Sequence, residues 1–131
     1  MIVYPSVIVH GLADAKAALA PGLQVTLLSA PGAAYFAGCV WWREIVSAAR
    51  AAFPDTEATD ILDCADASGT AMGALRSGSV RLVLWPEAPG WGGVATIAAR
   101  QGGFVLPKAP AGMDLAQPNE RRQLQAWLRS R

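Results

Sequence analysis

The chain carries little charge, and this shortage excludes several kinds of partner. Charged residues make up 16% of its 131 residues, hydrophobic residues make up 53%, and the formal net charge is +1. A chain this apolar is not disordered, because disordered segments are poor in apolar residues and rich in charge. A net charge near zero gives no long-range field that attracts nucleic acid or an anionic membrane surface. We therefore expect a folded protein that binds neither.

Cysteine and histidine are also scarce. The two cysteines, Cys39 and Cys64, form no C-x-x-C pair, and the single histidine, His10, has no cysteine near it in the sequence. Structural zinc sites need several such ligands at short spacings, so we expect no metal site. No sequence motif indicates a cofactor. Two unpaired thiols are typical of a protein in a reducing compartment.

The sequence shows no signal peptide and no apolar run long enough to span a membrane. No lysine or arginine precedes Lys16, so the basic region that begins a signal peptide is lacking. The longest apolar run covers residues 33–42, half the length of the ~20 residues that cross a bilayer. These features and the free thiols predict a cytoplasmic protein of the bacterial type.

Strand-forming and helix-forming segments alternate along the chain. We predict strands over residues 7–10, 23–29, 59–64, 80–85 and 104–106. We predict helices over residues 12–20, 33–53, 68–76, 91–101, and from 115 or 119 to 129. Such alternation indicates βαβ units and a mostly parallel sheet. The fold class is therefore a single α/β domain over residues 1–131, with three Rossmann-like or flavodoxin-like layers. The strand orders 2-1-3-4-5 and 3-2-1-4-5 both stay open, and the five-strand count favours the first.

The predicted sheet locates a binding edge without any motif. Ligands of open parallel sheets bind outside the carboxyl ends of the strands. The candidate ligand-binding residues are the glycines and polar or aromatic residues that follow the predicted strands: His10, Gly11, Ser29, Gly32, Asp63, Asp66, Ser68, Glu87, Trp91 and Lys108. We interpret 29–32 as a turn with proline at a helix start rather than a phosphate site, because it lacks a G-x-G-x-x-G pattern.

The most polar of these loops begins at Asp63 and allows three interpretations. Its carboxylates could hold a hard cation or perform acid–base chemistry. Alternatively, Asp66 or Ser68 caps the following helix, which is the interpretation we favour. A small enzyme would use His10, Asp63, Cys64 and Asp66, with His10 as the base that activates the Cys64 thiol.

Adjacent tryptophans on the long predicted helix suggest a contact with another chain. Trp41 and Trp42 point about 100° apart on a helix, so only one can lie at the centre of the buried stripe. Trp42 fits the stripe, and Trp41 falls toward its edge. Both are interface candidates. Our leading interpretation is a self-associating interaction domain, a homodimer, with a small-ligand site at the strand ends.

The segment 103–110, Gly-Phe-Val-Leu-Pro-Lys-Ala-Pro, followed by an amphipathic helix, resembles the end of a response-regulator receiver domain. The resemblance implies that Asp63 is the phosphorylated aspartate and that Lys108 is the family's lysine. The chain departs from the family where His10-Gly11-Leu12 replaces the acidic pair that binds Mg²⁺, and where Trp85-Pro86 replaces a Ser or Thr. The alternative function is therefore a degenerate receiver-like signalling domain without that acidic pair.

Overall fold

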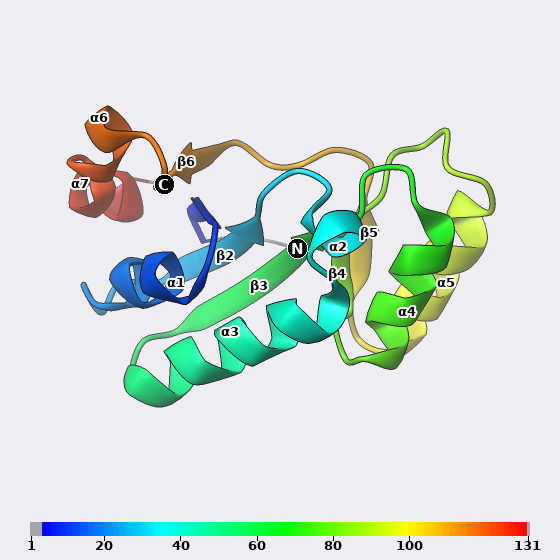
Figure 1. Ribbon diagram of the computed structural model, residues 1–131, viewed down its shortest axis with the longest axis horizontal. Helices are drawn as coiled ribbons and strands as arrows, with labels where there is room; N and C mark the ends of the chain where they lie inside the picture. The colour runs from blue at the N-terminus through cyan, green and yellow to red at the C-terminus, as the bar shows by residue number, and fades with distance from the viewer. Residues whose placement is uncertain (1–3, 131) are drawn as a thin grey trace. The chain divides into compact units, whose positions relative to one another are not determined.

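The computed structural model describes residues 4–130 and is an α/β fold with one sheet of six parallel strands (Figure 1). The strands are β1 (Ser6–Val9), β2 (Val25–Ser29), β3 (Ala58–Asp63), β4 (Arg81–Val83), β5 (Phe104–Leu106) and β6 (Gly112–Asp114). The predicted α/β fold with a mostly parallel sheet is confirmed, with six strands instead of five. The sheet order is β5-β4-β3-β2-β1-β6, which differs from both orders that the sequence left open.

Seven helices lie in the described part of the chain. They are α1 (Leu12–Leu19), α2 (Ala33–Phe36), α3 (Cys39–Ala52), α4 (Ser68–Arg76), α5 (Trp91–Arg100), α6 (Pro118–Arg121) and α7 (Leu124–Arg129). The chain divides into two compact units. The first unit comprises Met1–Leu28, Glu44–Asp60 and Pro110–Arg131, and the second comprises Ser29–Arg43 and Ile61–Ala109. No helix of the described residues is long and apolar enough to cross a membrane.

In the first unit, β1 pairs with β6 in parallel register, with Val7 opposite Met113 and Ile8 opposite Asp114. Val7 and Val9 on β1 are completely buried, as is Leu19 on α1. The C-terminal helix α7 is anchored to the same strand, because the Trp127 indole donates a hydrogen bond of 2.8 Å to the Ser6 carbonyl. The C-terminal segment is therefore part of this unit's packed structure.

In the second unit, β4 pairs in parallel with both β3 and β5. Ile61 and Leu62 on β3 and Leu82 on β4 are completely buried, as the apolar runs of a two-sided parallel sheet require. Helix α4 packs on α5 and on α2 (Figure 1). These strands and helices place the loops after β3 and β4 at one edge of the unit.

The predicted helix over 33–53 is two helices, and the break is at Gly38. Gly38 has a φ of 96°, in the left-handed region that glycine adopts without steric cost. Trp42 lies on α3 and is completely buried, as the helical stripe predicts. Tyr35 and Phe36, which a continuous helix would bury in the same stripe, are instead 77% and 69% exposed on α2. The break therefore removes two aromatic residues from the core.

Candidate functional site

The strand order reverses beside β1. Strands β1 to β5 follow one another across the sheet, whereas β6, which comes after β5 in the chain, pairs with β1. A reversal of strand order is the place where open α/β sheets form a crevice at the carboxyl ends of their strands. The residues at these two carboxyl ends, His10 after β1 and Asp114 at the end of β6, both belong to the first unit.

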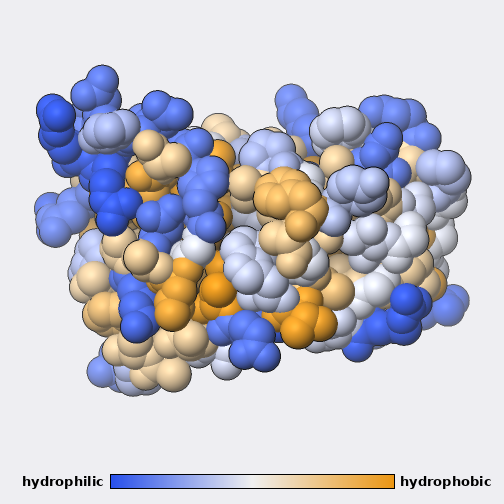
Figure 2. All heavy atoms as spheres, viewed as in Figure 1, coloured by the Kyte–Doolittle hydropathy of each residue, from blue (hydrophilic) through white to orange (hydrophobic). Residues whose placement is uncertain are grey.

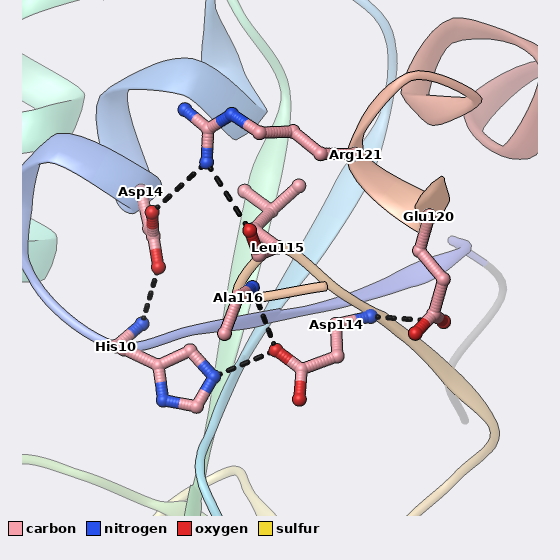
Figure 3. Close-up of polar contacts among 7 residues, drawn as sticks. All are labelled: His10, Asp14, Asp114, Leu115, Ala116, Glu120 and Arg121. Carbon is pink, nitrogen blue, oxygen red and sulfur yellow. Dashed lines mark hydrogen bonds and ion pairs between the residues drawn. The ribbon is translucent and has the colours of Figure 1, made fainter. Parts of the chain in front are cut away.

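His10 and Asp114 form a hydrogen-bonded pair at this edge (Figure 3). The His10 Nε2 and Asp114 Oδ1 atoms are 2.7 Å apart, and the two side chains are 38% and 28% exposed. Because a carboxylate accepts the hydrogen bond, Nε2 carries a hydrogen, and in the neutral form of the ring the lone pair then lies on Nδ1. Within residues 4–130, no group bonds to Nδ1, and this atom points away from Asp114 in Figure 3. The site thus offers a basic nitrogen to solvent.

Asp114 is held in its ionised form by its neighbours. Its Oδ1 also accepts a hydrogen bond of 2.9 Å from the Ala116 backbone N–H, as in an Asx turn. Burial alone would raise the pKa of Asp114, but the Ala116 N–H, the hydrogen bond from His10 and, when the ring is protonated, the charge of the imidazolium together lower it below its ordinary value. The carboxylate can therefore orient the ring and stabilise a positive charge on it.

Three further residues brace the pair from the neighbouring helices. Asp14 on α1 accepts the His10 backbone N–H through Oδ2 at 3.0 Å and accepts Arg121 through Oδ1 at 3.2 Å. Arg121 on α6 also donates to the Leu115 carbonyl, and the Glu120 carboxylate accepts the Asp114 backbone N–H at 3.4 Å (Figure 3). Asp14 lies in the first turn of α1, and its carboxylate reaches back past the N-cap residue Gly11 to His10, one residue before the N–H that a capping box would bond.

Sequence reasoning identified His10 but missed the rest of this network. A signal for Asp14 was present, because an acidic residue in a first helical turn often bonds backward. No signal pointed to Asp114, because it lies on a strand that sequence did not predict. Gly11, another predicted residue, is the N-cap of α1, where it provides no side-chain hydrogen bond to the helix.

In the second unit, the structure brings together Ser29, Gly32 and Asp63 from the predicted set. Asp63 is 2% exposed, and its Oδ1 accepts the backbone N–H groups of Gly32 at 3.1 Å and Ala65 at 2.9 Å. The Asp63 backbone N–H in turn donates to Ser29 Oγ at 2.9 Å. These bonds tie the loop after β2 to the loop after β3, so the Asp63 carboxylate has a structural task.

The neighbouring thiol is buried and difficult to ionise. Cys64 is completely buried. Burial, followed by the charges of Asp63 and Cys39, raises the pKa of Cys64 to about 12. The thiolate is the nucleophilic form of cysteine, so this environment opposes a nucleophilic role at neutral pH. His10, the base that such a role would need, belongs to the first unit and Cys64 to the second.

The remaining predicted residues follow β3, β4 and β5 on the second unit. Asp66, Glu87 and Lys108 are exposed. Ser68 donates its hydroxyl to the Pro89 carbonyl instead of capping α4, whose N-cap is Ala67 without a side-chain hydrogen bond. The predicted cap by Asp66 or Ser68 is therefore wrong. The half-buried Trp91 donates its indole N–H to the Leu84 carbonyl, which holds the loop between them.

A second surface of interest lies on α2 and the first turn of α3, in the second unit. Tyr35, Phe36 and Val40, which we call the α2 surface, are 77%, 69% and 63% exposed. Figure 2 shows hydrophobic atoms at the surface where Figure 1 draws these helices. Of the two predicted interface residues, Trp41 is half-exposed and Trp42 is completely buried, with ring centroids 6.0 Å apart. Trp42 therefore exposes no surface to a partner, and its ring lies beside that of Trp41.

Among residues 4–130, no group of three or more histidine, cysteine or acidic side chains is arranged to hold a metal ion. No protein-family model matches the sequence, and no curated protein is significantly similar to it. The two features that bear on function are therefore the His10–Asp114 pair and the α2 surface.

Proposed function

We propose that the protein is a self-associating binding domain of the bacterial cytoplasm. Two copies pair through the α2 surface, and a small ligand binds at the carboxyl ends of the strands. The observation that carries the proposal is the exposure of Tyr35, Phe36 and Val40, three large apolar side chains within six consecutive residues. The two free cysteines, Cys39 and Cys64, support the cytoplasm as the compartment.

A second copy of the chain suits this surface because the surface is uncharged. Residues 30–42 contain no Asp, Glu, Lys or Arg. A two-fold interface places the same patch against itself, so a patch with charges of one sign would repel its copy. An uncharged aromatic and aliphatic patch pairs with itself without that penalty, and aromatic residues are enriched at such contacts. A stable dimer commonly buries about 800 Å² on each partner, so Trp41 and the rest of α2 must also contribute.

Sedimentation measurements on matched variants test the proposal. Phe36→Ser and Val40→Ser each remove an exposed apolar group, so we expect both variants to fold normally. We expect each to weaken the dimer about tenfold or more, because truncation of a central interface residue commonly costs over about 1.4 kcal/mol. Leu12→Ser is the matched control, because Leu12 is a partly exposed apolar residue of the other unit. A wild-type protein that stays monomeric at high concentration would contradict self-association.

The two alternative functions have less support from the geometry. An enzyme that uses Cys64 with His10, Asp63 and Asp66 would need a thiolate, and the buried Cys64 opposes it. A degenerate receiver would need an accessible Asp63, whereas Asp63 is 2% exposed and bonded to two backbone N–H groups. Incubation with a small phosphate donor and Mg²⁺, followed by mass measurement, tests the receiver alternative. A phosphate on Asp63 would favour it.

A further inference from the structure

The single histidine has a feature that self-association does not use. The ring of His10 is fixed by Asp114 at 2.7 Å and leaves Nδ1 open at the reversal of strand order. The backbone of His10 is fixed separately, because its N–H donates to Asp14. Both the position and the tautomer of the ring are therefore set before any ligand arrives. Such advance positioning of a base is what acid–base sites require.

We propose that His10 is a general base that activates water toward a small uncharged ester, with Asp114 as its positioning residue. This inference rests on the proposed ligand edge and not on self-association. In the step, the O–H bond of a water breaks, the proton forms the Nδ1–H bond, and the electron pair of the water oxygen attacks the acyl carbon. The ester C–O bond then breaks with its electron pair on the leaving oxygen. The imidazolium that results faces the Asp114 carboxylate and later returns the proton to the leaving group or to solvent.

The charges around the ring select the class of substrate. The groups that face His10 or its partners are the carboxylates of Asp14, Asp114 and Glu120 and the guanidinium of Arg121. Arg121 already pairs with Asp14, so the site keeps a surplus of negative charge. An anionic substrate would be repelled, whereas an uncharged or cationic one would not. No serine or cysteine bonds to His10 among the described residues, so we propose water as the nucleophile.

The test uses p-nitrophenyl acetate, an uncharged ester whose leaving group is coloured. We expect the wild-type protein to hydrolyse it about 100-fold faster than His10→Gln, since a positioned base commonly contributes 10²-fold or more. His10→Gln is a fair comparison, because the side chain is 38% exposed and its amide can still donate to Asp114. The reaction should also slow about twofold or more in D₂O, because general-base catalysis moves a proton in the rate-limiting step. A rate that stays the same in D₂O would indicate direct attack of Nδ1 on the ester and would overturn the general-base role. Equal rates for the two proteins would overturn the proposal.

Asp114→Asn tests the positioning role by a measurement that a structural role would not affect. Nitrogen NMR of the single histidine reports the tautomer directly. We expect the hydrogen on Nε2 in the wild type, a mixture of tautomers in Asp114→Asn, and a matching loss of rate. A wild-type ring with its hydrogen on Nδ1 would overturn the assignment even if the ester is hydrolysed. Sedimentation of the same samples separates this result from self-association. A dimer without esterase activity would contradict only the role of His10 as a base. A monomer with esterase activity would contradict only the pairing of two copies through the α2 surface.

Discussion

At the scale of single residues, the Asp114 carboxylate connects two segments that lie 104 residues apart in the sequence. Asp114 accepts hydrogen bonds from the His10 ring and from the Ala116 backbone, and its own backbone N–H reaches Glu120. Its pKa is lowered because these donors and the imidazole charge outweigh the effect of burial. A group whose pKa is lower in the folded state stabilises the fold only while it is ionised.

The first prediction concerns the dependence of stability on pH. The contribution of Asp114 is fully present above the ordinary aspartate pKa of 3.8 and is lost as the pH falls through the lowered, folded-state pKa. We therefore expect wild type to be more stable than Asp114→Asn at neutral pH, and the difference to shrink in acid. Urea unfolding of both proteins over a series of pH values measures it. A difference that stays constant down to strong acid would contradict the ionic role of Asp114.

A second prediction distinguishes the two thiols. Cys64 is buried and its pKa is raised to about 12, whereas Cys39 is half-exposed and contacts the Ser77 hydroxyl at 3.3 Å. Thiol reagents attack the thiolate, so folded Cys64 should resist labelling. We expect one reactive thiol in the folded wild type, none in folded Cys39→Ser, and both thiols after denaturation. Rapid labelling of Cys64 in folded Cys39→Ser would contradict the buried environment.

At the scale of helices and strands, the sequence predicted five of the six strands and missed β6, and it merged α2 with α3 and α6 with α7 into single helices. Strand β4 is shorter than the apolar run that predicted it. Its last residue paired with β5 is Val83, and Leu84 and Trp85 lie beyond that pair. Strand β6 (Gly112–Asp114) has three residues, no β-branched side chain and a glycine, so nothing in its composition favours a strand. It forms because the neighbouring β1 supplies hydrogen-bonding partners, which is a tertiary cause. The missed strand explains why Asp114 was absent from the predicted site.

The helix break shows a similar limit of pattern reasoning. The apolar spacing from Tyr35 to Phe53 fits one long helix, and only Gly38 signals an interruption. A single glycine inside a helical pattern is often tolerated, so the pattern alone does not decide. In the structure, Gly38 adopts a left-handed conformation, and the apolar phase of α2 no longer follows that of α3. The α2 surface is thus a consequence of one backbone conformation.

A prediction at this scale concerns Gly103, which precedes β5. A Cβ atom at Gly103 would lie 1.8 Å from the Val80 carbonyl oxygen, which accepts the Phe104 N–H. Because backbone atoms cannot move aside as a flexible side chain can, Gly103→Ala should lower the free energy of unfolding by roughly 2 kcal/mol or more. Thermal or urea unfolding measures the loss.

Gly93→Ala is the control for this substitution. Gly93 lies in α5, and a Cβ there meets nothing within 4 Å. Alanine is a better helix former than glycine by up to about 1 kcal/mol, so this variant should be as stable as the wild type or more stable. If Gly103→Ala proved as stable as Gly93→Ala, the close approach of residues 80 and 103 would be refuted.

At the scale of the whole molecule, the alternation of strand and helix segments predicted the fold class, whereas the strand order determined which residues meet at the candidate site. The alternation of apolar runs and helical segments was sufficient for a parallel α/β sheet. The strand order could not be predicted, because it depends on which strands pair and not on where they lie in the sequence. The rule that ligands bind at carboxyl ends selected His10, which follows β1, but only the return of β6 beside β1 placed Asp114 next to it.

The low charge of the whole chain is consistent with the exposed apolar side chains of the α2 surface. With 16% charged residues, the protein has few charged side chains to cover its apolar surface. Three large apolar side chains remain exposed on consecutive turns of α2 and α3. Exposed apolar patches on folded proteins commonly mark interaction sites. We propose a second copy of the chain as the partner that covers this surface.

The measurement that tests this claim most directly is an NMR experiment on a mixture of isotope-labelled and unlabelled protein. It detects only contacts between different copies of the chain. We predict contacts from the Val40 methyl groups of one protomer to the rings of Tyr35 or Phe36 of its partner, in a single symmetric set. The absence of contacts between copies at the highest soluble concentration, or contacts confined to residues outside α2 and α3, would contradict self-association through the α2 surface.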